Sequence, residues 1–355
     1  MTTPAQQRLI DLQVDLQTAL LVEHATIPVY FAAWASLQTP PGSSAAGPLI
    51  NTNIAAQHVL RSVMVEEMLH MTQVANLLIA VGGKPSLIAP GFVLPANGTL
   101  PFSLPPIPVE IRPFSPEALA VFLDIERPMV PGAPGEDRKW TTIGQFYESI
   151  ESQYAAVLQD DPSLPGRNLE GQILPAAYYG AGELLLITGA GDAQSAIREI
   201  MDQGEGSGFG VFDDDASIFG PDGKEPAHYY RFLQLELGCM FAPGDTPASG
   251  PTGPHITVDF DGVNPMRPNA TRDDYASHPE IQSLLDSFTT MYGAMLATFD
   301  GAFNGGGSPA FQQATASMFA LGDLAAGITR TPDPTTPGST VGLVFAPTTS
   351  DTAGT

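Results

Sequence analysis

The sequence predicts a mainly α-helical protein built on a four-helix bundle, with long loop and short-strand insertions and an extra C-terminal helix pair. Apolar residues recur at steps of three and four, the spacing of one helix face, in four segments: 7–37, 53–81, 192–205 and 225–238. Each segment also carries an acid near its apolar stripe. A four-helix bundle can collect such acids at its centre.

Composition is consistent with one large domain. The chain has 355 residues, of which 43% are hydrophobic, and this is enough to bury a substantial core. We interpret residues 1–330 as a single domain and residues 331–355, rich in Pro, Thr and Gly, as a tail. The single cysteine, Cys239, excludes an internal disulfide and any cysteine-based zinc or iron–sulfur site.

Charge excludes two classes of partner. The net charge is −24, from 38 acidic and 14 basic residues, and such a field repels nucleic acid and anionic membranes. No apolar run reaches the roughly 20 residues that span a bilayer, and the N-terminus lacks the pattern of a signal peptide. We therefore expect a cytoplasmic protein with a small-molecule substrate, and leave homo-oligomer formation open.

The second helix, over about 53–81, carries the most informative motif. Glu67 and His70 lie three residues apart inside its apolar stripe. Burying a carboxylate and an imidazole is costly unless something pairs with them, and a metal ion bound by both offsets that cost. Glu66 is rotated by about 100° and is expected at the surface.

The first helix, over about 7–37, provides a second acid. Glu23 lies in a stripe that is otherwise apolar, and the loop that follows the helix brings it opposite Glu67 and His70. Tyr30 follows Glu23 by seven residues and therefore shares its face. We expect Tyr30 either to donate a hydrogen bond to a metal ligand or to pack in the core.

The segment 90–190 is interpreted as an insertion of loops and brief strands. It contains two short helices, at about 116–123 and 143–158, which we expect to roof a pocket. Glu126 follows the first of them and has no assigned role. Near the C-terminus, apolar stripes over 279–330 predict the extra helix pair.

The third bundle helix, over about 192–205, ends in an acidic and glycine-rich stretch. Ile197 and Met201 define its inward face, and Glu205 continues that face by one turn. Glu205 is therefore the predicted ligand. Glu199 and Asp202 flank the face and are the alternatives.

The fourth helix, over about 225–238, repeats the motif of the second. Glu225 and His228 again lie three residues apart, and Pro226 suits a first helical turn. Single acids on the first and third helices, with Glu-x-x-His on the second and fourth, are the ligand set of ferritin-like di-iron and di-manganese carboxylate bundles. The sequence therefore predicts a ferritin-like four-helix bundle with two metal ions.

Four carboxylates and two imidazoles balance the charge of two divalent ions and leave positions open for dioxygen or peroxide. Iron is the first expectation, manganese the second, and copper or zinc the third. Glu67 and Glu225 are the predicted bridging carboxylates, and Glu23 and Glu205 are the predicted terminal ones. His70 and His228 are the predicted imidazole ligands.

Four short motifs carry a resemblance to a known family: Val22–Tyr30, Val65–His70, Asp202–Gly206 and Ala227–Phe232. Their order resembles the ferritin-like domain of the iminophenyl-pyruvate dimer synthase family, which includes a component of violacein biosynthesis. The resemblance covers roughly 7–330. It implies a bacterial enzyme of secondary metabolism that oxidises a small molecule derived from an amino acid or imine. The alternative is a metal-binding or storage protein without an organic substrate, since storage ferritins use the same ligands.

Overall fold

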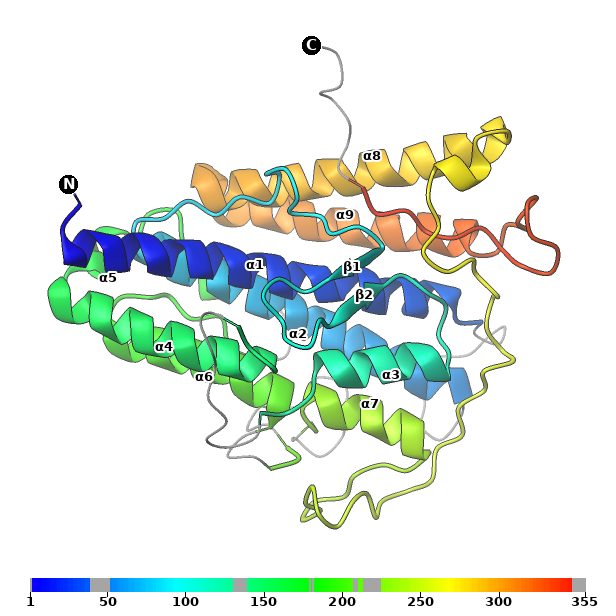
Figure 1. Ribbon diagram of the computed structural model, residues 1–355, viewed down its shortest axis with the longest axis horizontal. Coiled ribbons are helices and arrows are strands. Elements are labelled where there is room, and N and C mark those ends of the chain that lie inside the picture. The colour runs from blue at the N-terminus through cyan, green and yellow to red at the C-terminus, as the bar shows by residue number, and fades with distance from the viewer. Residues whose placement is uncertain are drawn as a thin grey trace.

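The computed structural model describes residues 2–38, 52–129, 139–178, 180, 182–206, 210–212 and 225–346. Most of this chain is helical, and the predicted fold class is confirmed (Figure 1). Two long helices, α1 (Pro4–Ser36) and α2 (Thr52–Ala80), pack along one another through most of their length. They form the centre of the bundle.

The first turn of α1 is stabilised by local contacts. The Thr3 backbone N–H donates to the Gln6 side chain at 2.8 Å, and the Gln6 backbone N–H donates to Thr3 Oγ1 at 3.2 Å. This reciprocal pair satisfies two N–H groups that lack a partner inside the helix. Pro4 occupies the first helical position, where its missing N–H costs nothing. These caps explain why α1 begins three residues before the predicted start.

Two pairs of shorter helices complete the bundle. Helices α3 (Pro116–Ile125) and α4 (Ile143–Asp160) both contact α1, whereas α6 (Ala190–Glu205) and α7 (His228–Leu237) both contact α2 (Figure 1). In addition, α4 packs on α6, and α3 packs on α7. The two helices of the predicted insertion therefore pack directly against the bundle and supply side chains to its centre.

Helix α7 begins later than the sequence pattern suggests. Glu225 and Pro226 are not helical, since Pro226 pairs with Phe212 in an isolated antiparallel bridge and Ala227 is the N-cap. Glu225 therefore precedes the helix that carries His228, and their three-residue spacing no longer places the two side chains on one face. The helix ends at Gly238, whose φ of 64° is left-handed.

The C-terminal helices α8 (Pro279–Gly301) and α9 (Gly307–Ile328) form a hairpin on the face of α1 opposite α3 and α4 (Figure 1). A short π-helical turn, η4 (Ala302–Gly306), joins them. The segment that follows α9 returns to the core, where Val341 and Leu343 are fully buried. The described part of the predicted tail is therefore packed against the domain.

The remaining elements are short. Strands β1 (Asn97–Thr99) and β2 (Pro108–Glu110) form an antiparallel pair. Within the described residues, single helical turns are formed by α5 (Leu164–Arg167), η1 (Pro175–Ala177) and η3 (Asp273–Tyr275). Among the described residues, no helix is both long and apolar enough to cross a membrane.

The second half of helix α2 is covered on every side, and each residue from Glu66 to Ala80 is buried. Beyond α1, α6 and α7, the loop around Ile173 and Leu185 packs on it, and Asn76 donates to the carbonyls of both residues at 3.0 and 3.1 Å. A helix segment that is buried on all faces has no exposed face that periodicity can reveal. The expectation of an exposed Glu66 is therefore wrong, since this side chain is only 1% exposed.

Candidate metal centre

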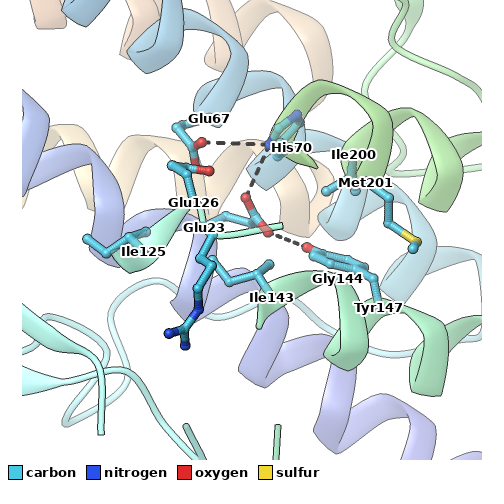
Figure 2. Close-up of a pocket in the computed structure, with 12 residues that line it drawn as sticks. Glu23, Glu67, His70, Ile125, Glu126, Ile143, Gly144, Tyr147, Ile200 and Met201 are labelled. Carbon is cyan, nitrogen blue, oxygen red and sulfur yellow. Dashed lines mark hydrogen bonds and ion pairs between the residues drawn. The ribbon is translucent and has the colours of Figure 1, made fainter. Parts of the chain in front are cut away.

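Five acidic and histidine side chains from four elements meet at the centre of the bundle. Glu23 comes from α1, Glu67 and His70 come from α2, Glu126 is the C-cap of α3, and His228 is the first residue of α7. All five are at most 6% exposed. Figure 2 shows the first four converging on one cavity.

Glu67 lies between the two imidazoles. Its Oε1 atom is 2.9 Å from Nδ1 of His228 and 3.9 Å from Nδ1 of His70. Its other oxygen, Oε2, accepts a hydrogen bond of 2.8 Å from the hydroxyl of Thr26, one turn beyond Glu23 on α1. Thr26 thus holds one oxygen of Glu67 and leaves the other facing both histidines.

Each histidine has a further carboxylate beside its Nδ1 atom. Glu23 Oε2 lies 3.3 Å from Nδ1 of His70, and Glu126 Oε2 lies 3.5 Å from Nδ1 of His228. The centre therefore consists of two half-sites that share Glu67. We call them the His70 half-site, with Glu23, and the His228 half-site, with Glu126.

A buried tyrosine holds the outer oxygen of each of these carboxylates. Tyr147 of α4 donates its hydroxyl to Glu23 Oε1, and Tyr30 of α1 donates to Glu126 Oε1. Burial and the neighbouring carboxylates raise the pKa of both tyrosines well above the usual value. Both phenols therefore stay protonated, as hydrogen-bond donors must.

The Nε2 atoms of the histidines point away from the cavity. His70 Nε2 lies 2.7 Å from Gln203 Oε1 of α6, and His228 Nε2 lies 2.8 Å from Glu66 Oε2 of α2. Both partners are acceptors, so the proton of each neutral imidazole resides on Nε2. This leaves the Nδ1 lone pair of both histidines directed into the centre, as a metal ligand requires.

An arginine stabilises the charge on Glu66. The Arg231 guanidinium contacts both oxygens of Glu66, at 3.0 and 2.9 Å. Burial by itself would raise the pKa of Glu66, but Arg231 and His228 outweigh it and lower the pKa to about 2. Arg231 also contacts Ser62 at 3.1 Å and Glu225 at 2.9 Å.

The crowding of acids perturbs the central groups. Burial and the nearby charge of Glu126 raise the pKa of Glu67 to about 7. Burial would lower the pKa of His70 and of His228, but the carboxylates around them outweigh it and raise both values. Without metal, the centre therefore holds protons at neutral pH, and a bound cation would displace them.

The donor set fits transition-metal ions. Three buried carboxylates in one cavity repel one another unless cations offset their charge. His228 Nδ1 is buried beside Glu67, yet the contact lacks the geometry of a hydrogen bond. Ligand atoms of Glu67, His70 and His228 all lie within 4.8 Å of one another. Mixed carboxylate and imidazole donors suit iron, manganese and zinc.

A small pocket reaches the centre between α3, α4 and α6 (Figure 2). Its inner end is lined by the carboxylates, His70 and Tyr147, and its other walls include Ile143, Met201 and Arg127. The cavity volume is about 20 Å³. Since a water molecule needs roughly 10–15 Å³ on this measure, the pocket admits water or a diatomic molecule.

The structure brings together four of the six predicted ligands: Glu23, Glu67, His70 and His228. Glu225 is not among them, because it lies before α7 and pairs with Arg231. The side chain of Glu205 lies outside the described residues. Of the two alternatives on α6, Glu199 accepts a hydrogen bond from the backbone of Glu183 at 2.5 Å. Among the described side chains of α6, Gln203 reaches the centre and contacts His70, while Tyr30 of α1 donates to Glu126.

Glu126 and Tyr147 carry a signal in the sequence that periodicity could have revealed. Glu126 follows Leu119 by seven residues and Phe122 by four, so it continues the buried face of α3. Tyr147 precedes Ile150 by three residues on the buried face of α4. This is the same signal that identifies Glu23. The assignment of α3 and α4 to an insertion is what obscures it.

Comparisons with known proteins agree with this fold. The "Ferritin-like" family model matches residues 16–237, a range that includes every residue of the two half-sites. A crystal structure at 1.95 Å resolution of a ferritin-like protein from Caulobacter vibrioides is similar, with a TM-score of 0.58 and 17% identity over 98% of this chain and 99% of that chain. No curated protein matches the chain. Since the family model covers more than half of its residues, the chain belongs to the ferritin-like family.

Proposed function

We propose that this protein is a di-metal carboxylate oxidoreductase that holds one ion in each half-site. The observation that carries the proposal is the shared position of Glu67, with one oxygen facing the Nδ1 atoms of both His70 and His228. Glu67 would bridge the ions, while Glu23 and Glu126 would each bind one. Iron is the first choice and manganese the second, and Glu205 remains a candidate for a further ligand.

The surrounding residues would keep the ligands in position. Tyr147, Tyr30 and Thr26 each occupy one oxygen of a carboxylate, so the remaining oxygen is directed to the centre. Gln203 and Glu66 orient the two imidazoles through Nε2. Bound ions with open positions would supply redox chemistry with dioxygen or peroxide.

An organic substrate would approach through the pocket wall that contains Arg127. This guanidinium donates to the Thr141 carbonyl at 2.9 Å and follows Glu126 in the chain. The resemblance to the iminophenyl-pyruvate dimer synthase family supports a small substrate derived from an amino acid or imine. A two-electron oxidation of such a molecule would match the two electrons that reduce peroxide to water.

The second candidate is metal binding or storage without an organic substrate. One observation favours it: the cavity volume of about 20 Å³ is too small for an organic molecule. An oxidase would have to open the pocket or act on a substrate at its mouth. A storage protein needs passage only for ions and dioxygen.

Elemental analysis of protein purified without a metal-affinity column tests the metal centre, and we expect two transition-metal ions per chain. Protein stripped of metal is the control. The ferrous protein is then mixed with dioxygen, with and without candidate amino and imino acids, and oxygen uptake is measured. Uptake that continues only with an organic substrate supports the oxidoreductase. Iron that accumulates far beyond two ions per chain, with no effect of organic molecules, supports storage.

A further inference from the structure

The two half-sites present the same inner atoms to the centre. In each, an imidazole Nδ1 lies beside one oxygen of an outer carboxylate, Glu23 for His70 and Glu126 for His228. A buried tyrosine holds the other oxygen of both carboxylates, and both half-sites share Glu67. The inner ligands that the structure describes therefore match in type, and a difference in charge lies behind them.

The atoms behind the imidazoles differ in charge. His70 Nε2 faces the neutral amide oxygen of Gln203 at 2.7 Å, whereas His228 Nε2 faces a carboxylate oxygen of Glu66 at 2.8 Å. Arg231 contacts both oxygens of Glu66 with two nitrogens, one of them on the same Oε2 atom that faces His228, and keeps Glu66 ionised. The partner of His228 Nε2 is thus an ionised carboxylate oxygen, whereas the partner of His70 Nε2 is a neutral amide oxygen.

A hydrogen bond to an anion is stronger than one to a neutral amide, and it pushes electron density onto the imidazole. The Nδ1 atom of His228 is therefore the better donor to a cation. We propose that the two metal positions are unequal, with the His228 half-site as the tight position filled first and the His70 half-site as the weaker, exchangeable one. This inference rests on the proposed di-metal function.

The position of the pocket adds to this difference. Glu23, Glu67 and Glu126 all line the pocket, but of the two histidines only His70 lines it, and His228 is completely buried. The weaker position is therefore the one next to the route by which ions and small oxidants enter. Gln203 is the residue that sets its strength, and Glu66 has the same role for the tight position.

Titration of metal-free protein with Mn²⁺ by calorimetry tests the inference. We expect two binding steps that differ at least tenfold in dissociation constant. His228→Ala should remove the tighter step, and His70→Ala the weaker one. Glu66→Gln should weaken the tighter step by about tenfold to a hundredfold. Glu110→Gln, which removes an arginine-paired carboxylate that contacts Arg112, should change neither.

The decisive variant is Gln203→Glu, because it should strengthen the weaker step by at least about tenfold, and a damaged fold cannot produce a gain in affinity. Gln234→Glu is its control, since it adds a buried acid whose side chain faces the Phe241 backbone. Equal steps in the wild type, or no gain with Gln203→Glu, would overturn the inequality and leave the di-metal function intact. Absence of any bound Mn²⁺ would overturn both.

Discussion

Adjacent residues of α1 enter two buried environments that differ in chemistry. Glu23 points into the metal centre, where His70 and two further carboxylates surround the cavity (Figure 2). His24 points to the other side, where its Nε2 lies 2.6 Å from the Tyr292 hydroxyl of α8 and its ring packs on Phe92 at 4.6 Å. Both histidines, His24 and His70, are nearly inaccessible to solvent.

The pKa values of the two histidines move in opposite directions. With only neutral partners, burial lowers the pKa of His24 to about 3. At His70 the same burial is outweighed by Glu23 and Glu67, and the pKa is raised. A buried histidine with a hydroxyl partner is thus a structural group, and convergent carboxylates are what distinguish a metal site from it.

The largest effect should follow from removing the shared ligand. Glu67→Ala should abolish binding of both ions, because Glu67 faces both histidines. His24→Gln should retain both ions, although the lost contact with Tyr292 should cost about 1–3 kcal/mol of stability. Elemental analysis of the two variants measures the difference. Full metal content in the Glu67 variant would contradict the assignment of the centre.

The second effect distinguishes two acids as metal ligands. Sequence spacing favours Glu225, whereas the structure favours Glu126. Glu126→Gln should lose one ion, because a neutral amide beside His228 cannot balance the charge of a cation. Glu225→Gln should keep both ions, since Glu225 contacts Arg231. Metal content again provides the measurement, and the reverse result would return Glu225 to the ligand set.

The third effect concerns the pH dependence of stability that the buried, neutral His24 produces. Because the pKa of His24 is about 3 in the folded protein and has its ordinary value of 6.5 in the unfolded chain, the unfolded chain binds the extra proton between these values. Stability from this group is therefore complete above about pH 6.5 and decreases as the pH falls toward 3. Between pH 7 and pH 5 the loss should be about 2 kcal/mol.

Urea unfolding of metal-free wild type and His24→Gln is measured at pH 7 and pH 5. The loss is the change in unfolding free energy between the two pH values in the wild type minus the same change in the variant. The carboxylates of the metal centre titrate in both proteins and cancel. An equal pH dependence in the two proteins would show that His24 is not held neutral by burial.

The smallest effect should come from the tyrosines. Tyr147→Phe removes the hydroxyl that holds Glu23 but no ligand, so affinity for one ion should fall by about tenfold. Tyr154→Phe is the matched control, because this buried tyrosine of α4 donates to the Leu77 carbonyl at 3.2 Å. Calorimetry with Mn²⁺ compares them. An equal loss in both variants would indicate a general effect on α4.

The sequence by itself determined the ferritin-like class and the parts of the centre that lie on long helices. Glu23, Glu67 and His70 sit inside continuous apolar stripes of α1 and α2, where spacing alone sets which side chains share a face. The positions of these side chains on α1 and α2 could be assigned without knowledge of contacts to distant residues. For the same reason Tyr30 could be placed on the face of Glu23.

Only the tertiary structure places Glu126 beside His228 and Glu225 beside Arg231. The pairing of Pro226 with Phe212 delays the start of α7, and the packing of α3 on α7 brings Glu126 beside His228. Neither contact is local in sequence. Sequence periodicity indicates which face of a helix is apolar. It does not indicate where that helix begins or which other helix packs against it.

The burial of Glu66 was decided in the same way. Because every residue of α2 from Glu66 to Ala80 is buried, exposure does not distinguish the polar residues there, and the charge of Glu66 is stabilised by Arg231 and His228. A buried charge is stable only where its counter-charge lies within a few ångströms. That proximity is a property of the folded chain, and no spacing within α2 contains it.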